Sequence, residues 1–317
     1  MPMNRIQFQA GLPLPSFLEQ FGTETPCAAA LEKACWPESF RCPPCGQAAH
    51  YVLHNRGRKT FPCQNWRMRT SRIAGTVFQS PPLALTVWFL AIYLIGQAKT
   101  GLSTLALKRH LGVSYPTAWR IQHKLMQAMT ERDAQYTRCG EVLVDDADVG
   151  GERVGGKAGR GSENKVPFVA AVSLQTEGHP LYTNMTPVAG FTCNALTDGA
   201  KAALAPGCQV IADGFACLSG VTAAGCYPPA ILVGLRTPHQ VPEFGWVNTL
   251  LGHLKTRFSG AYHAFNFAKY GSRYLAAFAS RFNRRFHRDT LPARLLVAAA
   301  AIGPRPARWL RQAEESC

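Results

Sequence analysis

Apolar positions change their spacing several times along the chain, and each change predicts a different kind of element. In the first forty residues, SFLEQFG and TPCAAALEKACW carry apolar residues at helical spacing, so we expect two short helices. Residues 40–75 replace that pattern with paired cysteines and alternating basic and aromatic residues, which favours a small β-ribbon. The run from Leu83 to Gly96 is apolar nearly throughout but shorter than the roughly 20 residues that a bilayer requires, so it predicts a buried helix.

The segment TGLSTLALKRHLGVSYPTAWRIQHKLMQAM predicts two short helices separated by a tight turn. Ser103 can cap the first helix, and Gly112 can end it in a left-handed conformation. Ser114 and Pro116 suit the first residues of the second helix. This order is typical of a helix-turn-helix, and an ordinary pair of packed helices is the alternative. The second helix would present side chains that can reach bases or phosphates, namely Tyr115, Thr117, Arg120, Gln122, His123 and Lys124.

The pattern changes again at Glu141, where short apolar runs begin to alternate with helical segments. VLVD, VPFVAAVSL and CQVIAD indicate strands, and NALTDGAKAALA indicates a helix. A Gly-rich basic loop, GGERVGGKAGRGSENK, separates the first two strands. From Phe244 to Arg285 the spacing is helical around a break at Ser259 and Gly260. Such alternation is typical of a mixed α/β domain of the catalytic kind.

Charge narrows the range of partners. Lys and Arg total 34 against 19 Asp and Glu, which gives a net charge of +15. No acidic residue occurs from Ser39 to Thr130, and a second basic stretch ends in RFNRRFHR. This one-sided distribution favours a polyanionic partner, with nucleic acid as the first candidate. No secretory signal opens the chain and its 11 cysteines are scattered, so we expect a cytoplasmic protein without a membrane partner.

Two carboxylates that follow apolar runs form a candidate cation site. Asp145 and Asp213 each come at the end of a predicted strand, the edge of an open α/β sheet where reacting groups collect. Two acidic side chains there repel each other unless a divalent cation lies between them, and Mg²⁺ is the natural one. Asp146 and Asp148 alternate onto the opposite face from Asp145. We favour Asp145 because it directly follows the apolar run, and we keep Asp146 as the alternative.

A helix further along the chain can complete this site. Asn248 precedes Lys255 by seven residues, or two helical turns, so both side chains lie on one face. Asparagine offers a neutral carbonyl oxygen to a hard cation, and lysine can hold a phosphate. Taken singly, an aspartate closing a strand is more often a turn former and an exposed lysine is more often solvated. The order of these residues along the chain favours a shared site.

At these residues the chain resembles bacterial insertion-sequence transposases with an N-terminal zinc ribbon, a helix-turn-helix and a DDE-type catalytic domain. It is similar to the subgroup in which Asn, followed by Lys, replaces the third acidic residue. The matching segments cover the chain from about residue 8 to 310, in the order CPPCG, TSRIAGTVF, LALKRHLGVSYPTAW, VDDADVGGERVGGKAGRGSENKVPFVAAV, ADG, WVNTLLGHLK, SGAYHAFNFAKY and RFNRRF.

The resemblance implies an α/β fold class and an order of domains. The order is an N-terminal helical segment (1–38), a zinc-ribbon-like module (39–75), a helix-turn-helix DNA-binding region (76–138), an RNase H-like catalytic domain (139–290) and a C-terminal tail (291–317).

The resemblance also implies the chemistry and the partners. Asp145, Asp213 and Asn248 would bind two Mg²⁺ or Mn²⁺ ions, with Lys255 assisting. Such enzymes cut a phosphodiester at the element end, and the freed 3′-OH then attacks target DNA in line. The partners would be the terminal inverted repeats and the target DNA, bound by a homo-oligomer.

Basic residues near the catalytic domain are further DNA-binding candidates. Arg160 lies in the Gly-rich loop, which can close over DNA or be an ordinary surface loop. Arg284 and Arg285 can contact phosphates near the active site or form a solvated helix face.

The chain departs from the family pattern at the zinc ribbon. Cys42, Cys45 and Cys63 match zinc ligands, but Trp66 stands where the last cysteine is normally found. Structural zinc almost always has four ligands, so Zn²⁺ binding would need a replacement for that cysteine. Otherwise the aromatic ring would fill the gap in a metal-free ribbon. The candidate replacements are Cys35, His50 and His54.

A histidine that relatives tend to carry soon after the position of Cys226 is also absent. These departures leave an alternative open, a decayed copy without catalysis that acts only as a DNA-binding protein. A nuclease for RNA–DNA hybrids would share the fold but would not explain the basic N-terminal module.

Overall fold

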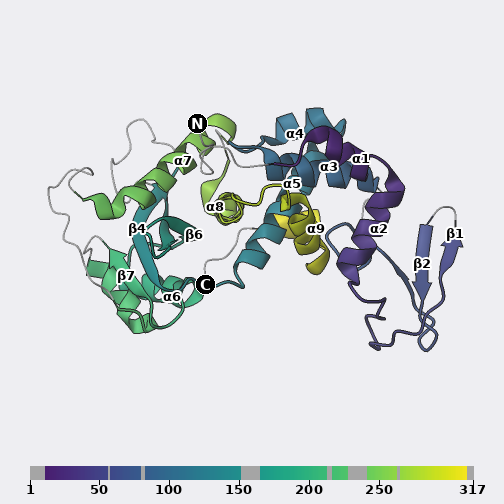
Figure 1. Cartoon of the computed structure of the whole chain (residues 1–317), viewed down its shortest axis with the longest axis horizontal. Helices are drawn as coiled ribbons and strands as arrows, with labels where there is room; N and C mark the ends of the chain where they lie inside the picture. The colour runs from purple at the N-terminus through teal and green to yellow at the C-terminus, as the bar shows by residue number, and fades with distance from the viewer. Residues whose placement is uncertain are drawn as a thin grey trace. The chain divides into compact units, whose positions relative to one another are not determined.

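The computed structural model describes residues 11–55, 58–79, 83–150, 165–212, 216–227, 241–262 and 265–312 (Figure 1). The chain divides into two compact units. The first comprises residues 1–128 and 286–310, and the second comprises residues 129–285 and 311–317. Each unit has buried hydrophobic residues of its own.

Helices dominate the first unit. They are α1 (Leu14–Phe21), α2 (Glu24–Cys35), α3 (Leu85–Gln97), α4 (Thr104–Leu111), most of α5 (Tyr115–Asp133), α9 (Leu291–Ala301) and α10 (Ala307–Arg311). Helix α3 is the apolar segment predicted as a buried helix, and it packs against α2 and α9 with Trp88 and Ile92 in the core. The segment expected as a C-terminal tail thus carries α9 and α10. Within the described ranges, no helix is long and apolar enough to span a membrane.

The expected β-ribbon is a three-stranded antiparallel sheet. Its strands are β1 (Leu53–Asn55), β2 (Arg58–Pro62) and β3 (Arg69–Ser71), in that order across the sheet. Phe40 and Phe61 stack with 5.1 Å between ring centroids, and Trp36 lies edge-on to both. Because a module this small buries little apolar surface, it usually needs a metal or neighbouring contacts to stay folded.

Local capping sets the turn between α4 and α5. The Ser103 hydroxyl accepts a hydrogen bond from the Ala106 amide at 3.1 Å, and Gly112 ends α4 with a φ of 64°. Both features match the sequence prediction, and glycine suits the second position because side chains are disfavoured at positive φ. Helix α5 is longer than the short helix we expected, since no glycine or proline interrupts the chain between Pro116 and Asp133.

The second unit is built on a four-stranded sheet in the order β6-β5-β4-β7. Its strands are β4 (Glu141–Val149), β5 (Val166–Leu174), β6 (Pro180–Pro187) and β7 (Gln209–Ala212). Strands β4 and β7 are parallel, and the other pairs are antiparallel. The unit is mixed α/β, as predicted, whereas β6 was not anticipated from the sequence.

Strand β4 does not end at Asp145, contrary to our expectation. Its pairing with β5 continues from the Asp145–Ala170 pair to Val149. The apolar run stops at Val144, but main-chain hydrogen bonds do not depend on side-chain polarity, so the ladder extends through the acidic residues. The strand that does end at this point is the neighbouring β7, whose last residue, Ala212, pairs with Val144.

Side-chain alternation gives the sheet two faces, each covered by helices (Figure 1). Val142 and Val144 pack against α6 (Cys193–Ala203) and the 3₁₀ helix η1 (Ala216–Ala224). Leu143 packs on the opposite face, against α7 (Gly245–Ala261) and α8 (Phe267–Phe282). A short 3₁₀ helix, η3 (Pro242–Phe244), leads into α7. The second unit therefore has three layers, with the sheet in the middle.

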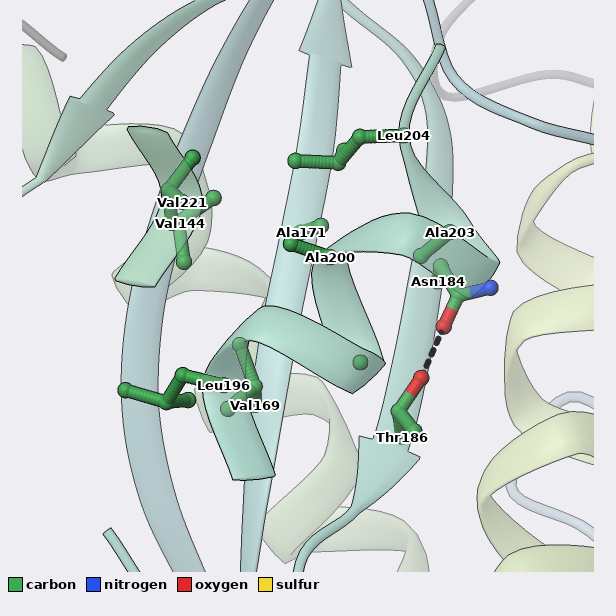
Figure 2. A pocket seen from close by; sticks show the side chains of 11 residues that line it. Val144, Val169, Ala171, Asn184, Thr186, Leu196, Ala200, Ala203, Leu204 and Val221 are labelled. Atoms are coloured by element: carbon green, nitrogen blue, oxygen red, sulfur yellow. Dashed lines mark hydrogen bonds between the residues drawn. The ribbon is translucent and has the colours of Figure 1, made fainter. Parts of the chain in front are cut away.

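A cavity of about 30 Å³ remains between α6 and the sheet (Figure 2). Ala200 of α6 and Val144 of β4 are among its lining residues. At its edge the side chains of Asn184 and Thr186 point toward each other, joined by a hydrogen bond of 2.6 Å (Figure 2). The space is about enough for one water molecule, so it is a packing void of the core.

The break between the last helices of the second unit falls later than predicted. Helix α7 runs through Ser259 and Gly260 to Ala261. Helix α8 begins after Asn266, whose side chain accepts a hydrogen bond from the Lys269 amide at 2.9 Å. Serine and glycine lower helix propensity near a helix end without stopping the helix, whereas an asparagine cap starts a new one.

Candidate functional sites

Asp145 lies on the sheet face that α7 covers. It alternates with Leu143 along β4, and Leu143 packs in the same cluster as the apolar side of α7. Asp146 and Asp148 alternate with Val144 on the face that α6 covers. All three carboxylates are half-buried. Of the three, Asp145 is therefore the one on the same side of the sheet as the helix with the candidate Asn and Lys.

Asn248 and Lys255 are both exposed on α7. Val247, Leu250 and Leu254 hold the other side of this helix in the core. Two helical turns separate the Cα atoms of Asn248 and Lys255 by about 10 Å along the axis. One solvent-facing surface of α7 thus presents an amide oxygen and an ammonium group.

Two of the sequence candidates, Asp213 and Arg160, lie outside the described residues. The residue before Asp213 in sequence, Ala212, pairs with Val144, the residue before Asp145. The described members of the candidate set, Asp145 and Asn248, offer carboxylate and amide oxygens. Those are the oxygen donors that Mg²⁺ and similar hard cations prefer, so the donor chemistry fits such an ion.

Three cysteines of the ribbon form a cluster that can hold a metal. The Sγ atoms of Cys42, Cys45 and Cys63 all lie within 4.8 Å of one another. The sulfurs of Cys45 and Cys63 are 3.6 Å apart. With Zn–S bonds of about 2.3 Å at tetrahedral angles, ligand sulfurs lie about 3.8 Å apart, so this spacing fits zinc.

Among the described residues, no fourth protein ligand joins this cysteine cluster. Cys35 and His50, two of the expected replacements, hydrogen-bond to main-chain carbonyl groups elsewhere. Trp66 is 64% exposed, so the idea that its ring fills the gap as a small core is wrong. The Trp66 main-chain amide instead donates a hydrogen bond to Cys63 Sγ at 3.5 Å.

The surroundings separate the acidities of two of these thiols. Burial raises the pKa of Cys42 to about 11. The pKa of Cys63 is lowered, chiefly because the Trp66 amide donates to its sulfur. Metals bind thiolates, so metal binding at this cluster would release the proton that Cys42 otherwise retains at neutral pH.

The exposed DNA-binding candidates lie at the start of α5. Tyr115 is 49% exposed, and Thr117 and Arg120 are half-buried. Lys124 is buried, and its Nζ donates a hydrogen bond to the Val77 carbonyl oxygen at 2.5 Å. The other buried polar side chains of α5 are Gln122, His123, Gln127 and Asp133. Of the predicted contacts on this helix, the N-terminal ones are therefore accessible to a large ligand.

Arg284 and Arg285 are engaged in contacts within the second unit. Arg284 pairs with the Asp133 carboxylate through two hydrogen bonds of 2.6 and 3.2 Å, and these side chains are only 11% and 10% exposed. Arg285 donates to the carbonyl oxygens of Leu181 and Pro180, and burial lowers its pKa to about 10. No local sequence pattern indicates the pairing of Arg284 with Asp133, because the two residues are 151 positions apart in the chain.

Family comparisons match both the ribbon and the α/β unit to one class of protein, the transposases. Residues 139–283 match the ISXO2-like transposase domain, and residues 22–65 match the transposase zinc-ribbon domain. Both matches agree with the sequence resemblance to bacterial insertion-sequence transposases that carry an N-terminal zinc ribbon. These matched domain families imply DNA binding and the use of a divalent metal. A comparison with curated proteins found no match.

Proposed function

We propose that the protein binds the ends of its insertion sequence and catalyses metal-dependent phosphodiester cleavage and strand transfer. The observation that carries this proposal is the register of two parallel strands. Val144 pairs with Ala212, so Asp145 and Asp213 each follow the same paired position in sequence. Neighbouring strands lie about 4.8 Å apart, a separation at which two carboxylates can share a divalent cation.

The proposed active site belongs to an RNase H-like domain over residues 139–290. Asp145 and Asp213 would supply the negative charge that binds the cations, and Asn248 a neutral oxygen ligand. Two bound Mg²⁺ or Mn²⁺ ions would supply activation of the attacking oxygen and stabilisation of the leaving oxygen. Lys255, two turns along α7 from Asn248, would bind a DNA phosphate. This contact would hold the DNA strand in position relative to the acidic side chains.

We assign end binding to α4 and α5, acting as a helix-turn-helix with Tyr115, Thr117 and Arg120 toward the DNA. In this motif the N-terminal residues of the second helix contact the bases, and Tyr115, Thr117 and Arg120 are accessible at that end of α5. The acid-free stretch from Ser39 to Thr130 supports binding to phosphates. A transposase has to join two ends, so we propose a homo-oligomer on DNA.

A strand-transfer assay on the element's own ends tests the catalytic site. We expect Asp145→Asn and Asp213→Asn to lower strand transfer by about 100-fold or more while end binding is kept, because the charge that binds the cation is lost. Asp148→Asn is the matched control, since it removes the same charge from the same strand on the other sheet face. We expect it to transfer strands nearly as well as the wild type.

Loss of activity in Asp146→Asn but not in Asp145→Asn would move the cation ligand to the alternative residue. Equal activity in all these variants would refute a catalytic role for this end of β4. The three-cysteine ribbon favours the second candidate function, a decayed copy that only binds DNA. That candidate predicts a wild-type protein that binds the ends and transfers no strand.

A further inference from the structure

A groove in the first unit joins segments that are far apart in sequence. Its volume is about 400 Å³. One wall is the side of α5 that carries Thr117, Arg120 and Lys124, and another is formed by residues 304–307 at the start of α10. The C-terminal segment therefore borders the same part of α5 that we assign to end binding.

The groove is strongly cationic. Arg120, Lys124 and Arg305 line it, and none of the described residues that line it is acidic. The sequence contains no Asp or Glu from 39 to 130 or from 290 to 313, the two stretches that build its walls. Three cations around one groove repel one another, and a bound anion relieves that repulsion.

One of these cations, the ammonium group of Lys124, is buried in the wall of the groove, and burial destabilises its charged form. Lys124 is 4% exposed, and its ammonium group donates to the carbonyl oxygens of Val77 and Gln79. Burial, with a smaller effect of Arg120, lowers the pKa of Lys124 to about 8, so the group is still mostly protonated at neutral pH. A buried charge of this kind is stabilised when an anion binds beside it.

Arg305 is the cation that the C-terminal segment adds. Its guanidinium group lies 4.8 Å from the centroid of the Trp309 ring. Stacking on an aromatic face limits the rotamers of an arginine, and Arg305 also donates a hydrogen bond to the Pro304 carbonyl oxygen at 3.4 Å, which further fixes its guanidinium group beside the groove. Arginine in such a position is well suited to bind a phosphate through two hydrogen bonds.

We propose that this groove binds a phosphate of the DNA backbone next to the base-contacting end of α5, with Arg305 as a phosphate ligand. The C-terminal segment then takes part in end binding together with the helix-turn-helix. This inference rests on the proposed function, because it takes α5 as the DNA-binding helix.

The salt dependence of DNA binding by the full-length protein tests the groove. Binding to labelled duplexes, one with the element end and one with a scrambled sequence, is measured over a range of salt concentrations. We expect Arg305→Gln to reduce the slope of log K against log salt by about 0.9, the value for one lost phosphate contact. Arg308→Gln is the matched control, because Arg308 is exposed only three residues further along the chain, on α10, and is not among the residues that line the groove. Arg308→Gln should leave the slope nearly unchanged. Arg305→Lys should have a slope close to that of the wild type, because lysine keeps the positive charge.

Equal slopes for the wild type and Arg305→Gln would overturn the groove proposal. Equal reductions in Arg305→Gln and Arg308→Gln would also overturn it, since they would indicate general attraction without a specific contact. Thermal melting of each variant confirms that it is folded. Failure of the proposed function gives a different result, a wild type that does not prefer the end duplex. The slope is measurable on either duplex, because phosphate contacts do not depend on sequence.

Discussion

Lys124 brings a charge into the core of the first unit, where its ordinary pKa of 10.5 falls to about 8 because of burial. Unfolding restores the higher pKa. Between about pH 8 and 10.5 the unfolded chain therefore binds more protons than the folded chain, and the contribution of Lys124 to stability rises with pH. Below pH 8 Lys124 is protonated in both the folded and the unfolded chain. Its contribution to the free energy of unfolding is then constant and at its least favourable value.

We expect Lys124→Met to remove that pH dependence while keeping the volume of the side chain. The free energy of unfolding, measured in urea from pH 7 to 10.5, should rise for the wild type relative to the variant above pH 8. Burial raises the pKa of Cys27 and Cys35 to about 11, which acts in the opposite direction. Both proteins share those thiols, so their effect cancels in the difference. A difference that does not change with pH would contradict the predicted titration.

The Asp133–Arg284 pair is the second residue-scale feature with a clear energetic consequence. Both side chains are nearly buried and joined by two hydrogen bonds. We expect Arg284→Ala to lower the free energy of unfolding by about 3 kcal/mol, because it leaves the Asp133 carboxylate buried without its cation. The double variant Asp133→Ala/Arg284→Ala should recover part of that loss in urea denaturation. A loss below about 0.5 kcal/mol in the single variant would place the pair among ordinary surface contacts.

Helix α6 contains a glycine that its packing does not require. A Cβ atom at Gly199 would meet no atom within 4 Å, and the residue borders the 30 Å³ void. We expect Gly199→Ala to stabilise the protein by about 0.5–1 kcal/mol, because alanine favours the helix. Gly220 in η1 is the contrasting control, since its Cβ would lie 2.4 Å from the Cys193 carbonyl oxygen. Gly220→Ala should therefore lower the melting temperature, and equal effects at the two sites would contradict this packing.

Elements with strong local signals were predictable from the sequence. The apolar run of α3, the Ser103 cap and the Gly112 turn each depend on a few neighbouring residues, and the structure contains them as predicted. The end of β4 and the existence of β6 were not predictable, because both depend on pairing with β5. The period of two in strands and of 3.6 in helices was enough to predict that Asp145 lies on the opposite sheet face from Asp146 and Asp148. It was also enough to predict that Asn248 and Lys255 share one side of α7. The burial of Lys124 depends on packing against Val77 and Gln79, which no local pattern reveals.

For the molecule as a whole, the ribbon is a small module whose set of metal ligands is incomplete among the described residues. It has a four-residue core of Phe40, Cys42, Phe61 and Cys63, and three thiols placed for a metal that usually takes four ligands. Position 66 lies beside that cluster, because its amide reaches Cys63 Sγ. The main chain of a cysteine at position 66 would therefore already lie close to the three sulfur atoms.

We expect Trp66→Cys to tighten zinc binding by about 10-fold or more, since a fourth thiolate completes the tetrahedral site. Met68→Cys is the matched control, because Met68 is also exposed in the same short segment but contacts Cys63 differently: its carbonyl oxygen accepts from the Cys63 main-chain N–H, whereas the Trp66 N–H donates to the Cys63 sulfur. Competition with a chromophoric chelator measures the affinity, and a melting curve with and without chelator shows how much stability the metal adds. Zinc should raise the melting temperature more in Trp66→Cys than in the wild type, because metal bound only by the folded ribbon stabilises it in proportion to its affinity. Equal affinities in the two cysteine variants would mean that position 66 cannot reach the metal, and the gap in the ribbon would then require a ligand from outside the chain.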